Sequence, residues 1–149
     1  MMAAPSIQQI LDGVEAVLRG IDGLRVTDYS PGQVTPPQAI ITVPPITYRQ
    51  TFGARRWQLD MTITVLTSAA LDRAGQRRLA EFADHTGPRS IFQAFGGAGG
   101  GVDLDGLVEV AYITGFAPLG LEQVGQIGYF GGEFTLTVVA PGTVVAPGG

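Results

Sequence analysis

Residues 57–65 alternate strictly between apolar and polar side chains. The apolar members are Trp57, Leu59, Met61, Ile63 and Val65, and the polar members between them are Gln58, Asp60, Thr62 and Thr64. Because successive side chains of a β-strand point to opposite faces of a sheet, this period of two predicts a long strand with one buried face. We expect this strand, 57–66, to be central in its sheet and its five apolar side chains to lie in the core.

The N-terminal part of the chain predicts an amphipathic helix over residues 6–19. Ser6 and Gln9 have the spacing of a capping box, and Gly20 suits the position just beyond the last turn. Apolar residues then recur at helical spacing and form one stripe: Ile7, Ile10, Leu11, Val14, Val17 and Leu18.

Prolines divide the chain between this helix and the long strand. Residues 24–29 alternate and predict a short strand, whereas 39–43 form a continuous apolar run that predicts a strand buried on both faces. Pro44 and Pro45 interrupt this second strand. We expect residues 45–56 to form an extended arm outside the core.

Two further helices are expected after the long strand. One covers about residues 72–84, with Asp72 as its N-cap. The other is short and is predicted to begin at Gly87-Pro88, because proline is favoured at the first helical position. Its inward residues would be Ile91, Phe92 and Phe95.

Two strands, 107–114 and 128–139, complete the predicted elements, and the glycine run 96–101 is interpreted as a flexible connection. The order is α-β-β-β-α-α-β-β. Clustered strands favour an α+β fold with a mixed, mostly antiparallel sheet and helices packed mainly on one face. We expect a single domain over residues 1–149, in which about 141–149 form a mobile Pro/Gly tail.

The composition excludes several classes of protein. The chain has no cysteine, which excludes disulfides and zinc–thiolate sites, and its net charge of −4 argues against a general nucleic-acid binder. No stretch approaches about 18 consecutive apolar residues, so no membrane span is predicted. Only 15% of the residues are charged. Either the surface is rich in Gly and Thr, or much of it is covered by other copies of the chain or by partners.

No group of residues predicts catalysis. His85 is the only histidine and is expected to face solvent at a helix end, and neither Ser68 nor Ser90 lies in a Gly-x-Ser-x-Gly turn. The glycine run lacks the Lys-Ser/Thr pair of a phosphate-binding loop. We therefore expect no catalytic residue and no cofactor.

Three acidic residues, Asp103, Asp105 and Glu109, could approach a hard cation, but they lack the full set of oxygen ligands of an EF-hand. A solvated acidic turn is the favoured interpretation, and no structural metal is expected.

The arm 45–56 contains the residues that we expect at an interface. Tyr48 and Phe52 could fold back on the core or anchor a partner, since aromatic residues are enriched at interface hot spots. Arg55 and Arg56 could be solvated or could pair with carboxylates of another subunit, because the guanidinium binds carboxylates in a bidentate manner.

The predicted helix 72–84 carries Arg73, Arg77 and Arg78, and the first two share a face. They form either an ordinary solvated face or a surface that pairs with carboxylates of a neighbouring subunit.

Several short motifs, taken in order over roughly residues 7–139, resemble the tail terminator proteins of long-tailed phages of actinobacteria, which are similar to the lambda tail terminator. The chain opens with an amphipathic helix that ends in the strand Gly23-Leu24-Arg25-Val26, and it continues with a tyrosine–proline crossing, the paired prolines, and Tyr48 with Thr51-Phe52-Gly53. The later motifs are Thr64-Val65-Leu66, Asp72-Arg73 with Gln76, and Gly128-Tyr129-Phe130-Gly131-Gly132-Glu133-Phe134.

The resemblance implies a structural virion protein rather than an enzyme. Such proteins are small α+β subunits that close into a six-fold ring, cap the completed tail tube and provide the attachment surface for the head–tail connector. The implied partners are other copies of the chain, the major tail tube protein and the connector, and DNA passes through the ring without specific binding. The implied location is the head-proximal end of the tail in the virion, and the host cytoplasm during assembly. The alternatives are another neck component, such as a head-closure protein, or a small cytosolic ligand-binding domain.

Overall fold

A computed structural model of the chain describes residues 6–21, 23–27, 37–41, 45–48, 56–68, 73–124 and 127–141. Its elements, in chain order, are α1 (Ile7–Arg19), β1 (Arg25–Thr27), β2 (Gln38–Ile41), β3 (Ile46–Tyr48), β4 (Arg56–Ser68), α2 (Arg73–Ala83), α3 (Ile91–Ala94), the 3-10 turn η1 (Gly97–Gly99), β5 (Val110–Val124) and β6 (Ile127–Pro141). The fold is α+β, as predicted.

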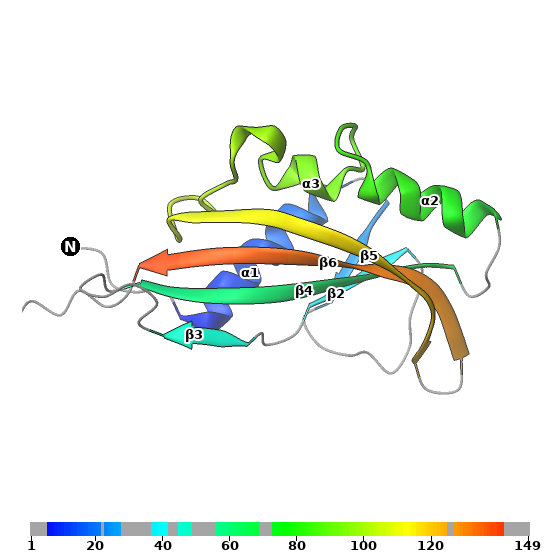
Figure 1. Ribbon diagram of the computed structural model, residues 1–149, viewed down its shortest axis with the longest axis horizontal. Coiled ribbons are helices and arrows are strands. Elements are labelled where there is room, and N and C mark those ends of the chain that lie inside the picture. The colour runs from blue at the N-terminus through cyan, green and yellow to red at the C-terminus, as the bar shows by residue number, and fades with distance from the viewer. Residues whose placement is uncertain are drawn as a thin grey trace, which may run out of the picture.

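The strands form one mixed sheet in the order β1-β2-β4-β6-β5 (Figure 1). β1 pairs with β2 in parallel, and the pairings of β2 with β4, β4 with β6 and β6 with β5 are antiparallel. The predicted long strand, β4, is the third of these five strands. Its central position is therefore confirmed.

The alternation along β4 corresponds to its two faces. Leu59, Met61, Ile63 and Val65 are fully buried, whereas Thr62 is exposed. The side chain of Trp57, the fifth predicted core residue, lies outside the described part of the structure. The strand opposite, β6, contributes Leu136 and other buried side chains to the same face.

The described helices cover one face of the sheet. The stripe predicted on α1 is confirmed, because Ile10, Leu11, Val14 and Leu18 are buried and Ile7 and Val17 are partly buried against the core. Phe82 of α2 and Phe95 after α3 belong to the same apolar cluster as the inner residues of β4. The helices and the sheet therefore form two layers around one core.

The capping box at the start of α1 is also confirmed. The backbone N–H of Gln9 donates to Ser6 Oγ at 3.1 Å, and the backbone N–H of Ser6 donates to Gln9 Oε1 at 2.8 Å. At the other end, Gly20 has an ordinary right-handed conformation, with φ of −73°, and its N–H contacts the carbonyls of the last turn. A left-handed glycine ending is therefore not used here.

The start of α3 differs from the prediction. The helix begins after Ser90 rather than at Gly87-Pro88, because the Ser90 hydroxyl caps it by accepting from the backbone N–H of Gln93 at 3.0 Å. Gly87 has φ of +109°, a left-handed conformation outside helical space. Proline's preference for the first helical turn was outweighed by a serine N-cap two residues later.

Part of the arm pairs with the sheet, which the prediction had excluded. β3 is antiparallel to β4, with Ile46 opposite Leu59 and Tyr48 opposite Trp57. It lies along the same edge of β4 as β2, where Ile41 is opposite Ile63. β3 is displaced by one residue from the register that β2 would have if it continued along β4. The prolines interrupt the strand without ending its pairing.

β5 is longer than the sequence suggested. It was predicted over 107–114 and continues to Val124, with irregular pairing between Ile113 and Gly115 and between Pro118 and Gly120. At each irregularity the alternation of side chains between the two faces of the sheet is interrupted. The period-two pattern of hydrophobicity therefore fails to predict the part of β5 beyond it. β5 and β6 remain paired beyond the last pair of β4 with β6, and the hairpin bends away from the sheet (Figure 1).

Candidate interaction surfaces

The predicted interface residues lie mostly outside the described structure. Phe52 and Arg55 are not described, and Tyr48 and Arg56 are described only as backbone in β3 and β4. Both strands place this part of the chain at the end of the sheet where Arg56 is opposite Pro141. Their role as an interface therefore stays a prediction.

His85 follows the end of α2 and is exposed, as expected. Its Nδ1 lies 3.1 Å from a carboxylate oxygen of Asp84. The hydroxyl of Ser90 is occupied, since it accepts from Gln93 and donates to the carbonyl of Asp84. A serine held in these two backbone contacts serves as a helix cap.

Asp103, Asp105 and Glu109 are exposed and belong to the turn that precedes β5. Asp105 and the buried Leu104 both have positive φ, at 60° and 53°. Within the described ranges, no group of three or more acidic, histidine or cysteine residues could hold a metal ion. The same ranges contain no helix long and apolar enough to cross a membrane.

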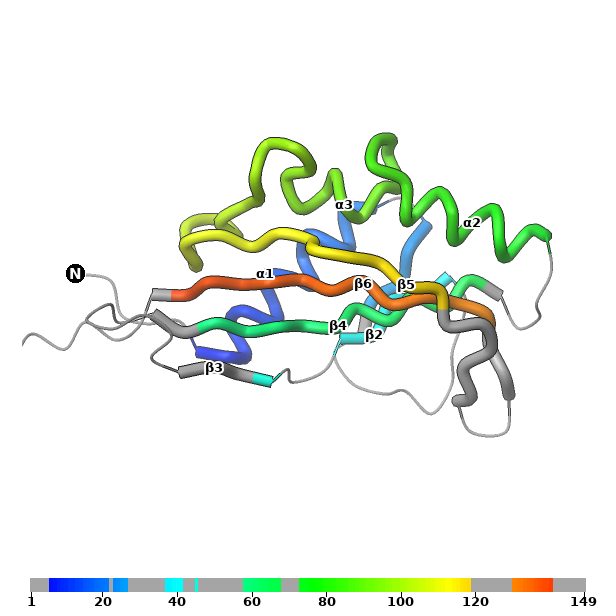
Figure 2. Tube along the Cα trace, in the orientation of Figure 1, coloured from blue at the N-terminus to red at the C-terminus, as the bar shows by residue number. Residues whose placement is uncertain are grey.

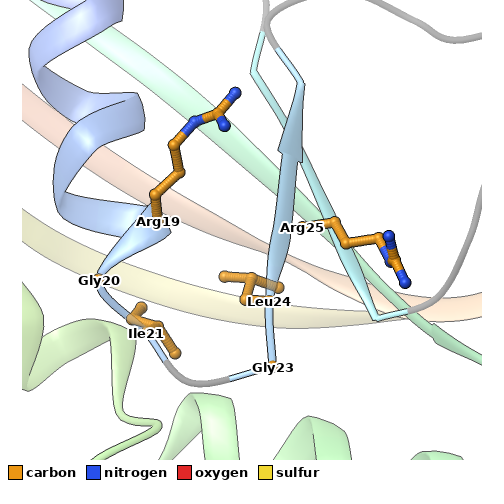
Figure 3. Close-up of a pocket in the computed structure, with 6 residues that line it drawn as sticks. All are labelled: Arg19, Gly20, Ile21, Gly23, Leu24 and Arg25. Carbon is orange, nitrogen blue, oxygen red and sulfur yellow. The ribbon is translucent and has the colours of Figure 1, made fainter.

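A shallow cavity of about 480 Å³ lies between the end of α1 and the start of β1, lined by Arg19, Gly20, Ile21, Gly23, Leu24 and Arg25 (Figure 3). The two guanidinium groups point away from each other in this view. Arg19 pairs with Glu15 on its own helix, and its Nη2 lies 3.4 Å from the Val26 carbonyl. The cavity therefore does not bring two free cations together around one ligand.

The face of the sheet opposite the helices is polar in its described part. Thr62 and Thr135 are opposite each other on β4 and β6, and both are exposed. Asp60 accepts from Gln58 Nε2 at 2.9 Å and from the Thr137 hydroxyl at 3.3 Å. Short polar side chains thus form much of this face, which supports the interpretation that a Gly- and Thr-rich surface accounts for part of the low charge.

The outer face of α2 is basic. Arg73, Arg77 and Arg78 are exposed, while Leu79 and Phe82 face the core. None of the three arginines forms an ion pair within the described residues. Sequence reasoning identified these arginines but could not indicate where the helix lies on the sheet.

Thr67, which the sequence did not single out, fixes the position of α2. Its hydroxyl is buried and donates to the carbonyl of Gly75 at 2.9 Å, which ties the first turns of α2 to the end of β4. Gly75 is itself buried, which lets the helix backbone approach the strand. A threonine among the polar residues of a strand gives no sequence signal for this contact.

No family model matches the chain, and no curated protein matches it.

Proposed function

We propose that this chain is a structural virion protein that caps the completed phage tail tube as a homo-oligomeric ring, most simply a hexamer. The ring then offers the attachment surface for the head–tail connector. The ordered set of motifs that resembles tail terminators supports this function, and we expect no catalytic activity. The proposed location is the head-proximal end of the tail.

The observation that carries the proposal is the two-sided architecture. Helices pack on one face of the sheet, and the other face carries exposed, short polar side chains such as Thr62 and Thr135. The two outer strands also differ, since β1 has three residues and β5 has fifteen. A ring needs two different surfaces that fit each other and a rotation that closes, and a subunit with unlike ends meets the first requirement.

A small ligand-binding domain is less well supported. Ligand pockets usually bury most of their ligand among apolar side chains with a few convergent polar groups. The cavity beside Arg19 and Arg25 is shallow, and its two cations diverge. Another neck component is the second alternative, and the partner that the chain binds distinguishes it from a tail cap.

Deletion of the gene from its phage tests the function directly. We expect tails of irregular, extended length that fail to join heads, because an uncapped tube end keeps its interface free for further subunits. Electron microscopy of the particles measures tail length and joining, and the intact gene supplied in trans is the control. Tails of normal length joined to heads would show that the proposal is wrong.

Phe52→Ala tests the arm separately. If Phe52 is a buried anchor against a neighbouring subunit or the tube, the change should weaken assembly by about 1–3 kcal/mol. Folding of the isolated subunit should change little. Thermal unfolding and tail capping are measured on the same preparation. Heavy loss of stability, together with normal capping by the folded fraction, would place Phe52 in the core instead.

A further inference from the structure

We infer that the arginine face of α2, defined by Arg73, Arg77 and Arg78, docks on the acidic turn of a second copy of this chain, defined by Asp103 and Asp105. The partner is therefore another subunit, and the contact is head-to-tail. This inference rests on the proposed ring and specifies which surfaces meet in it.

The two surfaces lie at opposite ends of the molecule. Thr67 ties α2 to one end of β4, while Val102, just before the acidic turn, bridges Ala111 of β5. Ala111 is opposite Val138 of β6, and Val138 is opposite Leu59 of β4. The acidic turn therefore lies near the Leu59 end of β4, whereas α2 is attached at Thr67. These two residues are eight apart in β4, which corresponds to roughly 26 Å at about 3.3 Å per residue. Figure 2 shows α2 at the right and the segment leading into β5 at the left.

This separation prevents the two surfaces from neutralising each other within one subunit. Physiological salt screens exposed charges beyond about 8 Å. No ion pair to Asp103, Asp105 or the three arginines exists within the described residues. A second subunit placed head-to-tail would bring an acidic turn to the arginine face, and the same contact repeats in every subunit.

Arg73 is also badly placed for the stability of the helix that carries it. Arg73 is the first residue of α2, where the helix dipole disfavours a positive charge, and the first turn contains no acidic residue. Arg77 lies four residues on and repels it. A charge that opposes its own helix is explained if a partner supplies a carboxylate.

The acidic turn is held in place by the buried side chain of Leu104, which packs against α1. Leu104 is buried, and its Cβ and Cδ1 lie 3.4 Å from the position that a Cβ on Gly13 of α1 would take. The flanking Asp103 and Asp105 remain exposed. All nine basic residues of the chain are arginines, and the planar guanidinium is suited to bidentate pairing with carboxylates.

Charge reversal tests the contact. Arg77→Glu and Asp105→Arg should each weaken self-association about tenfold, since each places like charges together. The double variant should recover most of the loss, because the pair is restored with opposite polarity. Arg19→Glu changes the net charge by the same amount at an exposed side chain of α1 that belongs to neither surface, and it should have no effect. Association is measured by sedimentation velocity at several salt concentrations.

Crosslinking tests the same contact without altering charge balance elsewhere. The natural chain has no cysteine, so Arg77→Cys with Asp105→Cys gives one defined thiol pair. A short bis-maleimide is used because a disulfide needs Cα atoms within about 7 Å. The double variant should form a ladder of linked subunits that ends at the ring, and each single variant should not.

The outcomes separate this inference from the proposed function. Rings that form without crosslinking, or a double charge reversal as weak as the single ones, would overturn the contact and leave the function standing. Crosslinked rings from a gene whose deletion leaves tails normal would overturn the function and leave the contact. A wild-type chain that stays monomeric, alone and with tail tubes, would overturn the contact as well.

Discussion

Gly131→Ala is expected to destabilise the protein by about 3 kcal/mol or more, because β6 lies so close to the neighbouring central strand, β4, that no side chain fits there. A Cβ on Gly131 would lie 2.1 Å from the Val65 carbonyl oxygen and 2.9 Å from Leu66 Cδ2. The first of these atoms is backbone of β4, which is paired on both sides. Relief of the clash would therefore require β4 and β6 to separate.

Thermal unfolding measures this effect. For a chain of this length, 1 kcal/mol corresponds to roughly 2–4 °C in Tm, so a loss of about 6–12 °C is expected. Gly115→Ala is the matched control, because a Cβ there meets nothing within 4 Å. Gly132→Ala should be intermediate, since its nearest atoms belong to the movable ring of Phe116. Equal Tm values for the Gly131 and Gly115 variants would contradict the close approach of β6 to β4.

The elements that the sequence predicted well are those whose signal is long and local. The stripe and capping box of α1 and the alternation of β4 each repeat over several residues, so the pattern survives any single exception. α2 was also predicted close to its observed bounds, Arg73–Ala83. In these segments, local preference and the final packing agree.

The elements that the sequence missed depend on pairing with a neighbouring strand. β3 has three residues, and its pairing follows from a one-residue shift in register along β4. The far part of β5 contains Gly115, Pro118 and Gly120, which weaken any strand prediction. Each is stabilised by pairing with the next strand along the chain, β4 for β3 and β6 for β5.

The candidate interaction surface shows the same division. The arginines of α2 stood out in the sequence because three lie within six residues. Their relation to Asp103 and Asp105 depends on the path from β4 through β6 to β5, which sequence spacing does not reveal. Only the register of the sheet shows that the two groups lie at opposite ends.

The glycine run 96–101 gives the second large effect, because the structure replaces the predicted flexible connection with a defined turn. Gly97–Gly99 form a 3-10 turn between two left-handed glycines, Gly96 and Gly100. The backbone N–H of Gly99 donates to the Gly96 carbonyl at 2.9 Å. Gly97 is buried. Gly96 is thus required by its conformation and by the close approach of Gly101, which its place in a glycine-rich run does not reveal in the sequence.

Gly96→Ala is therefore expected to cost at least about 2 kcal/mol, because two penalties combine. Gly96 has φ of +92°, a region that alanine rarely adopts, and its Cβ would lie 2.5 Å from the backbone of Gly101. Gly99→Ala is the control, since a Cβ there has open space and the residue has no positive φ. In a flexible connection both variants would unfold alike, at or slightly above the wild-type temperature, because alanine reduces the entropy of the unfolded chain. A clear drop in Tm for Gly96→Ala alone would show that the run is a built turn, which holds the segment leading to the acidic turn against β5.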